Sequence, residues 1–463
     1  MESVTEESGT AGLSRKVGSI THRAARDPVE GHRRVRGMVG RRLCRVYIVG
    51  RVDESRGAAT PGWRQRLLRG GLAAFTGLAV LATSSCWASE DAGPAATPHA
   101  TLTATPTRSP ALPEPTGRHP VGTTSLHLKD TSRKDPWVRA ATVRELMVSL
   151  WYPATSPAGQ RAPYMTPTES DLVLKHAKIT TVPPDALSTT RTNAFHDATP
   201  AGETRSLPLV VLSPGFTNPR STLTALAEDL ASNGYVVAAV EHTYESVATT
   251  FPDGRVTTCV ACQEPNKDET FWKKLVRGRA TDIAFVLDQL TGPQPMWNGS
   301  RLIDPSGIAM AGHSIGGASS IDAMLGDPRV RAGINFDGET EDTIPDSGLP
   351  RPFLFLGREY GHRPGDQERS WERTWEGLTG WKRWLVVAGT QHGSFTDLVL
   401  LGDQLGIMRS SQMPGARSME ITRAYTRAFF DQHLRNQPQP LLERPSASYP
   451  EVRFCSAQTK TCT

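Results

Sequence analysis

The feature that most restricts the fold is a series of short apolar segments, several of them continuously apolar, alternating with amphipathic ones. The apolar segments predict strands at residues 146–152, 207–212, 235–240, 307–311, 330–336, 353–356 and 384–387. Residues 221–232, 281–290 and 421–434 instead have helical spacing. Strands that are apolar on both faces belong to parallel sheets covered by helices. The alternation therefore predicts an α/β fold, with a doubly wound, mostly parallel sheet and helices on both faces.

The N-terminal quarter of the chain has a different composition. Residues 89–118 are mostly Ala, Thr, Ser and Pro, which bury too little apolar surface to order themselves, so they predict a linker. An apolar run with arginines ahead of it predicts a signal peptide or membrane anchor at 63–88. Residues 1–62 form an Arg-rich leader, disordered or preceding the true start. One catalytic domain is predicted over 119–458.

Export is the expected location, either secreted or tethered to the outer face of the membrane. Residues 1–70 hold 15 Lys and Arg against 7 Asp and Glu, so the basic excess lies outside the catalytic domain. This distribution argues against a nucleic-acid partner. Cys86 is a candidate for lipidation directly after the apolar run.

Four cysteines lie in the predicted catalytic domain. In an oxidising compartment they allow three disulfide pairings. The local pairing is favoured, and a four-thiolate zinc site or a redox Cys-x-x-Cys is the weaker alternative. The favoured partners are Cys259 with Cys262 and Cys455 with Cys462.

A Gly-His-Ser-Ile-Gly sequence at residues 312–316 carries the chemistry. An apolar strand enters it and a helix of small residues leaves it, which is the setting of a nucleophile elbow. Such a turn exposes the serine at the carboxyl end of the strand, and the flanking glycines avoid clashes with neighbouring backbone. The alternative is an ordinary Gly-rich turn. The context favours Ser314 as a nucleophile.

A serine hydroxyl needs a general base, and the base needs an acid to orient it. His392 follows the predicted strand at 384–387, in a loop where sites of open α/β sheets lie. Asp337 and Glu359 each follow a predicted strand, and position alone does not choose between them. The oxyanion donors are expected to be the backbone N–H groups of Ile315 and of Phe216, which lies in a Ser-Pro-Gly-Phe turn.

From Pro120 onward the chain resembles the plasma-type platelet-activating-factor acetylhydrolases and their bacterial relatives. The matching pieces occur in order at residues 120–122, 150–153, 214–216, 240–242, 312–317, 336–338 and 391–392. The resemblance implies an α/β-hydrolase fold that removes short acyl groups from lipid esters, with no metal or other cofactor. It also implies Asp337 as the acid, because the family's acid lies about two dozen residues after the serine. Many members have His-Gly where this chain has Pro214-Gly215, which leaves the substrate class open.

Three alternatives remain at this stage. One is a general lipase or cutinase-like polyester hydrolase, and another is a non-catalytic surface protein on the same fold. Glu241 and His242 could form a metal pair, although a structural histidine at a strand end is favoured. The expected partner is a small lipid or ester substrate. The apolar residues 398–401 offer a membrane-surface contact or, more simply, core.

Overall fold

The computed structural model describes residues 109–407 and 412–463. The predicted leader, the signal or anchor, and all but the end of the predicted linker lie outside the described residues. The strands are β1 (Val121–Asp130), β2 (Arg144–Pro153), β3 (Phe195–His196), β4 (Leu207–Ser213), β5 (Val236–His242), β6 (Thr249–Thr250), β7 (Val256–Thr257), β8 (Ile303–His313), β9 (Val330–Phe336), β10 (Phe353–Arg358), β11 (Lys382–Val387), β12 (Val452–Ser456) and β13 (Thr461–Cys462). The α-helices are α1 (Pro167–His176), α2 (Thr224–Ser232), α3 (Glu269–Thr291), α4 (Ile315–Gly326), α5 (Glu359–His362), α6 (Ser370–Gly377), α7 (Asp397–Gln404) and α8 (Gly415–Arg435). Short 3-10 helices lie at Ala186–Thr189, Arg220–Leu223, Ala261–Gln263, Ser300–Leu302, His392–Phe395 and Pro440–Leu442.

One large sheet organises these elements, with the strand order β13-β12-β11-β10-β9-β8-β4-β5-β2-β1-β3. The six central strands from β11 to β5 run parallel to one another. Antiparallel strands flank this block, with β2 and β1 on one side and β12 and β13 on the other. The predicted doubly wound, mostly parallel α/β sheet is confirmed.

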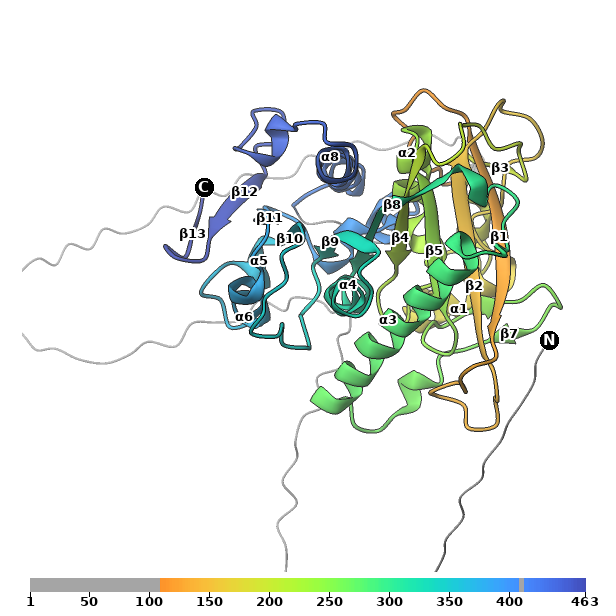
Figure 1. The fold of residues 1–463 in the computed structure, drawn as a ribbon. Coiled ribbons are helices and arrows are strands. Elements are labelled where there is room, and N and C mark those ends of the chain that lie inside the picture. The colour runs from red at the N-terminus through yellow and green to blue at the C-terminus, as the bar shows by residue number, and fades with distance from the viewer. Residues whose placement is uncertain (1–108, 408–411) are drawn as a thin grey trace, which may run out of the picture. The chain divides into compact units, whose positions relative to one another are not determined.

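Helices cover both faces of the sheet, as Figure 1 shows. Alternate residues of β4 point to opposite faces because side chains alternate along a strand. Val210 and Leu212 pack in the core with α2 and α8, and Leu209 and Val211 pack in the core with α3, α4 and α6. The buried apolar surface on both faces explains why the central strands are continuously apolar.

The ordered fold is wider than the predicted boundaries of 119–458. Ahead of residue 119, the backbone N–H of Thr116 donates to Asp229 of α2 at 2.8 Å, and Arg423 of α8 donates to the Glu114 carbonyl at 3.0 Å. After residue 458, β13 pairs with β12. The packing therefore includes the end of the segment expected to be linker.

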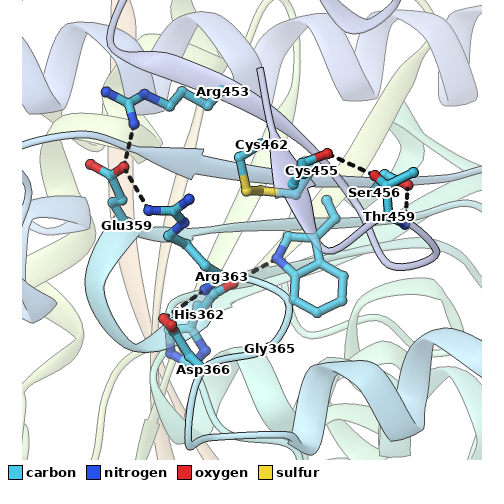
Figure 2. Close-up of a disulfide and its surroundings, with 12 residues drawn as sticks. Glu359, His362, Arg363, Gly365, Asp366, Arg453, Cys455, Ser456, Thr459 and Cys462 are labelled. Atoms are coloured by element: carbon cyan, nitrogen blue, oxygen red, sulfur yellow. Dashed lines mark hydrogen bonds and ion pairs between the residues drawn. A yellow bond between two sulfur atoms is a disulfide. The ribbon is translucent and has the colours of Figure 1, made fainter.

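The cysteines of the described part form two local disulfides. The structure joins Cys259 to Cys262 and Cys455 to Cys462, which is the favoured pairing. The second of these joins β12 to β13 (Figure 2). Within residues 109–407 and 412–463, no helix has the length and apolar character needed to cross a bilayer.

Candidate active site

Ser314 lies at the turn between β8 and α4. Its φ of 55° and ψ of −126° belong to a region that non-glycine residues rarely adopt. Its backbone N–H donates to the Phe336 carbonyl at 2.8 Å, which fixes the turn against the end of β9. The strain is therefore held by neighbouring backbone, and the serine is presented at the carboxyl edge of the parallel strands.

The glycines on either side of the serine are required by close backbone contacts. A Cβ atom on Gly312 would lie 2.3 Å from the Gly316 carbonyl carbon, and one on Gly316 would lie 2.1 Å from the Ser213 oxygen. Any side chain at either position would push the turn away from β4. This steric need explains the Gly-x-Ser-x-Gly spacing at residues 312–316.

His392 and Asp337 form a hydrogen-bonded pair. The Nδ1 atom of His392, in the loop after β11, lies 2.6 Å from Oδ2 of Asp337, which follows β9. The imidazole side chain is 45% exposed and the carboxylate is fully buried. Because Nδ1–H donates to the carboxylate, Nε2 is left as the ring nitrogen that can accept a proton.

Asp337 accepts further hydrogen bonds that keep it ionised. The Arg358 backbone N–H donates to Oδ1 at 2.7 Å, and Arg358 Nη1 donates to Oδ2 at 2.6 Å. Burial alone would raise the pKa of Asp337, but His362, His392 and Arg358 together hold that pKa well below the ordinary value of a carboxyl. His362 lies 3.5 Å from Oδ1. Burial lowers the pKa of His362, whereas Arg358 supplies a permanent positive charge beside the carboxylate.

Glu359, the alternative acid, is bound elsewhere. Its carboxylate accepts a hydrogen bond from Arg453 of β12 and lies 3.6 Å from Arg363, as Figure 2 shows. Arg453 lies two residues before Cys455 in β12. The structure brings His392 together with Asp337 and not with Glu359.

The two expected oxyanion donors lie in one apolar cluster. The side chains of Phe216 and Ile315 pack with Phe271 and with Cys259. Ile315 is the first residue of α4, where backbone N–H groups have no intrahelical acceptor. In the described part of the chain, no protein acceptor bonds to the N–H of Phe216 or of Ile315. Both groups are free to bind an oxygen of a substrate.

His313 is a neighbour of the site that the sequence did not reveal. Its Nε2–H donates to the His392 carbonyl at 2.7 Å, and the centroids of the two imidazole rings lie 4.6 Å apart. Burial, together with the charge of His392, lowers the pKa of His313 to about 3. The ring is therefore neutral at physiological pH, and its donated hydrogen bond anchors the His392 loop to the elbow.

Glu241 and His242, the possible metal pair, bind other protein groups. His242 Nδ1 lies 2.8 Å from Asp282 and its Nε2 lies 3.0 Å from Ser213 Oγ, while Glu241 binds Arg220 at 2.9 Å. These partners make both residues structural.

Residues 399–401 are buried in the core with α1, so this stretch is core and not a lipid-facing surface.

Comparison with known proteins identifies the family. The family model "Platelet-activating factor acetylhydrolase, isoform II" matches residues 105–291 and 297–439. The chain belongs to this family. It is an ester hydrolase with the α/β-hydrolase fold, as the resemblance of residues 120–392 implies.

Individual relatives of the family differ in how much of their length is matched. A "Probable 1-alkyl-2-acetylglycerophosphocholine esterase" of Arthroderma benhamiae is 29% identical over 376 residues, covering 74% of this chain and 93% of that protein. A platelet-activating factor acetylhydrolase of Cavia porcellus is 27% identical over 255 residues, covering 49% of this chain and 57% of that one. The chain thus spans little more than half the length of the second relative.

A solved structure of similar fold is the "Ferulic acid esterase from Streptomyces cinnamoneus". It is 44% identical in sequence, with a TM-score of 0.67. The match covers 75% of this chain and 100% of that one. The likeness therefore spans a whole esterase domain.

Proposed function

We propose that the chain is a serine esterase that removes short acyl groups from lipid esters. The observation that carries the proposal is that the strained Ser314 elbow lies beside the His392–Asp337 pair at the carboxyl edge of the parallel strands. The ring of the adjacent His313 lies 4.6 Å from that of His392, and the Ser314 N–H donates to Phe336, the residue before Asp337. The matched family and its fungal and mammalian members support the substrate class.

The proposed reaction is acyl transfer to Ser314. His392 Nε2 takes the hydroxyl proton as Oγ attacks the ester carbonyl, and Asp337 stabilises the imidazolium that forms. The N–H groups of Phe216 and Ile315 bind the oxyanion. His392 then gives its proton to the leaving alcohol. Water, deprotonated by His392, releases the acid and restores the serine.

Esters of aromatic acids are a second candidate substrate class. The ring centroid of Phe216 lies 5.8 Å from that of Phe271 and 5.6 Å from that of Trp272. The ring centroid of Trp137 lies 5.6 Å from that of Phe271. Phe216, Trp272 and Trp137 are only partly buried. Aromatic surface beside the oxyanion donors suits a planar ring, and the ferulic acid esterase of 44% identity supports this candidate.

Both substrate classes can be compared in one panel. Residues 109–463, oxidised, would be assayed on nitrophenyl esters from acetyl to palmitoyl and on methyl ferulate. We expect the highest kcat/KM on acetyl or butyryl esters, and a loss of about 10⁵-fold or more in kcat in Ser314→Ala. A long-chain optimum would favour a lipase, and a preference for methyl ferulate would favour the aromatic class. A folded protein without turnover on any ester would contradict the proposed function.

Arg358 is expected to set the acid side of the pH profile. Its Nη1 lies 3.0 Å from His392 Nδ1, and the ionisable groups around this ring are Asp337, Arg358, His313 and His362. Removing the cation in Arg358→Gln favours the protonated imidazole, which cannot act as a base. We expect the acid limb of kcat/KM to move to higher pH by about half a unit or more. The check is a pH profile from 5 to 9, and an unchanged acid limb would contradict this role.

We also propose that the chain is exported. The arginines and apolar run at residues 63–88 and the two disulfides support this location. Fractionation of producing cells, with a Cys86→Ala variant, separates free protein from protein held at the membrane by a lipid. Recovery of the full-length chain from the cytoplasm alone would contradict export.

A further inference from the structure

A cluster of charged side chains is buried directly beneath the turn at residues 213–218, called the oxyanion loop from here on. Its members are each at most 6% exposed, and include two arginines. A buried charge is costly unless it is paired, and pairing often only compensates for the cost. The members are Asp135, Arg144, His242, Glu245, Arg279 and Asp282.

Arg279 of α3 binds the start of the oxyanion loop. Its Nη1 donates to the Pro214 carbonyl at 2.5 Å and to Ser213 Oγ at 3.2 Å. Its Nε donates to Glu245 Oε2 at 2.7 Å. The planar guanidinium thus ties the loop to Glu245 through donors of fixed relative geometry.

Glu245 binds the far side of the same loop. Its backbone carbonyl accepts the N–H of Thr217 at 3.0 Å. Its side chain accepts from Arg279 and, at 2.9 Å, from Trp137 Nε1. One residue therefore connects to the loop before Phe216 through Arg279 and after Phe216 through its own backbone.

We propose that Arg279 and Glu245 are positioning residues that hold the Phe216 N–H in the oxyanion hole. The peptide before Gly215 is fixed by Arg279 and the peptide before Thr217 by Glu245, and the unpaired Phe216 N–H lies between them. The inference rests on the proposed role of Phe216 as an oxyanion donor.

The backbone conformation of the loop shows why it needs a clamp. Thr217 has a φ of 73°, which is unfavourable for a β-branched residue. No helix or strand of the sheet includes residues 214–219, since β4 ends at Ser213 and the next helix begins at Arg220, and an isolated bridge between Thr217 and Ser246 is the loop's link to the chain around Glu245. Oxyanion donors are effective because they are already in place when charge develops, so a shift of about 1 Å can cost about a hundredfold in rate.

The test separates placement of the donor from stability of the fold. The variants are Arg279→Met, Arg279→Lys and Glu245→Gln. The readouts are kcat and KM on a short-chain nitrophenyl ester, and the inhibition constant of a trifluoromethyl ketone. In the ketone adduct, Ser314 Oγ bonds to the carbonyl carbon, the hydroxyl proton passes to His392, and the carbonyl oxygen becomes an oxyanion in the hole.

We expect Arg279→Met to lower kcat about 10- to 100-fold, with KM within about threefold. The affinity for the ketone should fall by a similar factor. Arg279→Lys keeps the positive charge but not the paired guanidinium donors, so its loss of kcat should be smaller than that of Arg279→Met. Glu245→Gln should lower kcat several-fold. If Arg279→Met does not fold, the other two variants carry the test.

The matched control is Arg423→Met in α8. Arg423 is 5% exposed and donates to the carbonyls of Ala225, Glu114 and Pro113, away from the oxyanion loop. We expect this control to lose stability while keeping kcat and ketone affinity. Folded variants at Arg279 and Glu245 that lose only stability would overturn the proposal. Retained hydrolysis in Ser314→Ala would instead overturn the proposed function.

Discussion

Asp337→Asn is expected to lower kcat about ten-thousandfold in a protein that still folds. An asparagine amide can donate to His392 Nδ1, which stabilises the ring tautomer that cannot accept the serine proton. The change also removes the negative charge that stabilises the imidazolium. In this chain the loss has a further cause, because Arg358 would then face His392 without its carboxylate partner. The measurement is kcat on a nitrophenyl acetate, with far-UV circular dichroism to verify folding.

Glu359→Gln is the matched control for this prediction. The residue follows β10 as Asp337 follows β9, yet its carboxylate binds Arg453 and Arg363. We expect Glu359→Gln to keep kcat within about twofold, since its carboxylate binds arginines and not the His392 ring. A loss as large as that of Asp337→Asn would show that Glu359 is the acid, against the geometry.

The elements around the elbow could be predicted from the sequence because their signals are local. The strand entering Ser314, the glycines beside it and the helix leaving it all lie within residues 303–326. The choice between Asp337 and Glu359 was different. The resemblance implies Asp337, but no pattern near either carboxylate separates the two, because His392 reaches Asp337 and Arg453 reaches Glu359 from much later parts of the chain.

Helix α3 shows what a local pattern cannot reveal. The sequence predicts a helix over residues 281–290, while the structure extends it from Glu269 to Thr291. Arg279 and Asp282 occupy buried positions where an amphipathic helix should be apolar, so they interrupt the expected stripe. They are buried because Arg144 and Glu245 pair with them from distant parts of the chain. Polar residues on a buried helix face can thus indicate a functional network rather than a helix end.

Asp282→Asn is expected to destabilise the fold by about 3–5 kcal/mol at pH 7. The carboxylate is fully buried and accepts hydrogen bonds from Arg144 at 2.7 Å, Arg133 at 2.5 Å and His242 at 2.8 Å. The amide has nearly the same shape but removes the negative charge that Arg144 and Arg133 share, so that Arg144 keeps Asp135 and Arg133 keeps Asp130 as partners. Urea unfolding should show the loss as a lower midpoint with an unchanged slope.

The same carboxylate predicts how this loss changes with pH. Burial alone would raise the pKa of Asp282, but Arg144 and His242 hold it well below its ordinary value of 3.8. As the pH approaches 3.8, the unfolded chain binds a proton that the folded protein does not, so the contribution of Asp282 is complete above about pH 5 and is lost as the pH falls further. The difference in unfolding free energy between wild type and Asp282→Asn should shrink between pH 5 and pH 3. The control is Asp288→Asn, whose exposed pair with Arg329 should contribute less than about 1 kcal/mol. A loss at Asp282 no larger than at Asp288, or one independent of pH, would mean that the buried cluster does not hold α3 to the sheet through this charge.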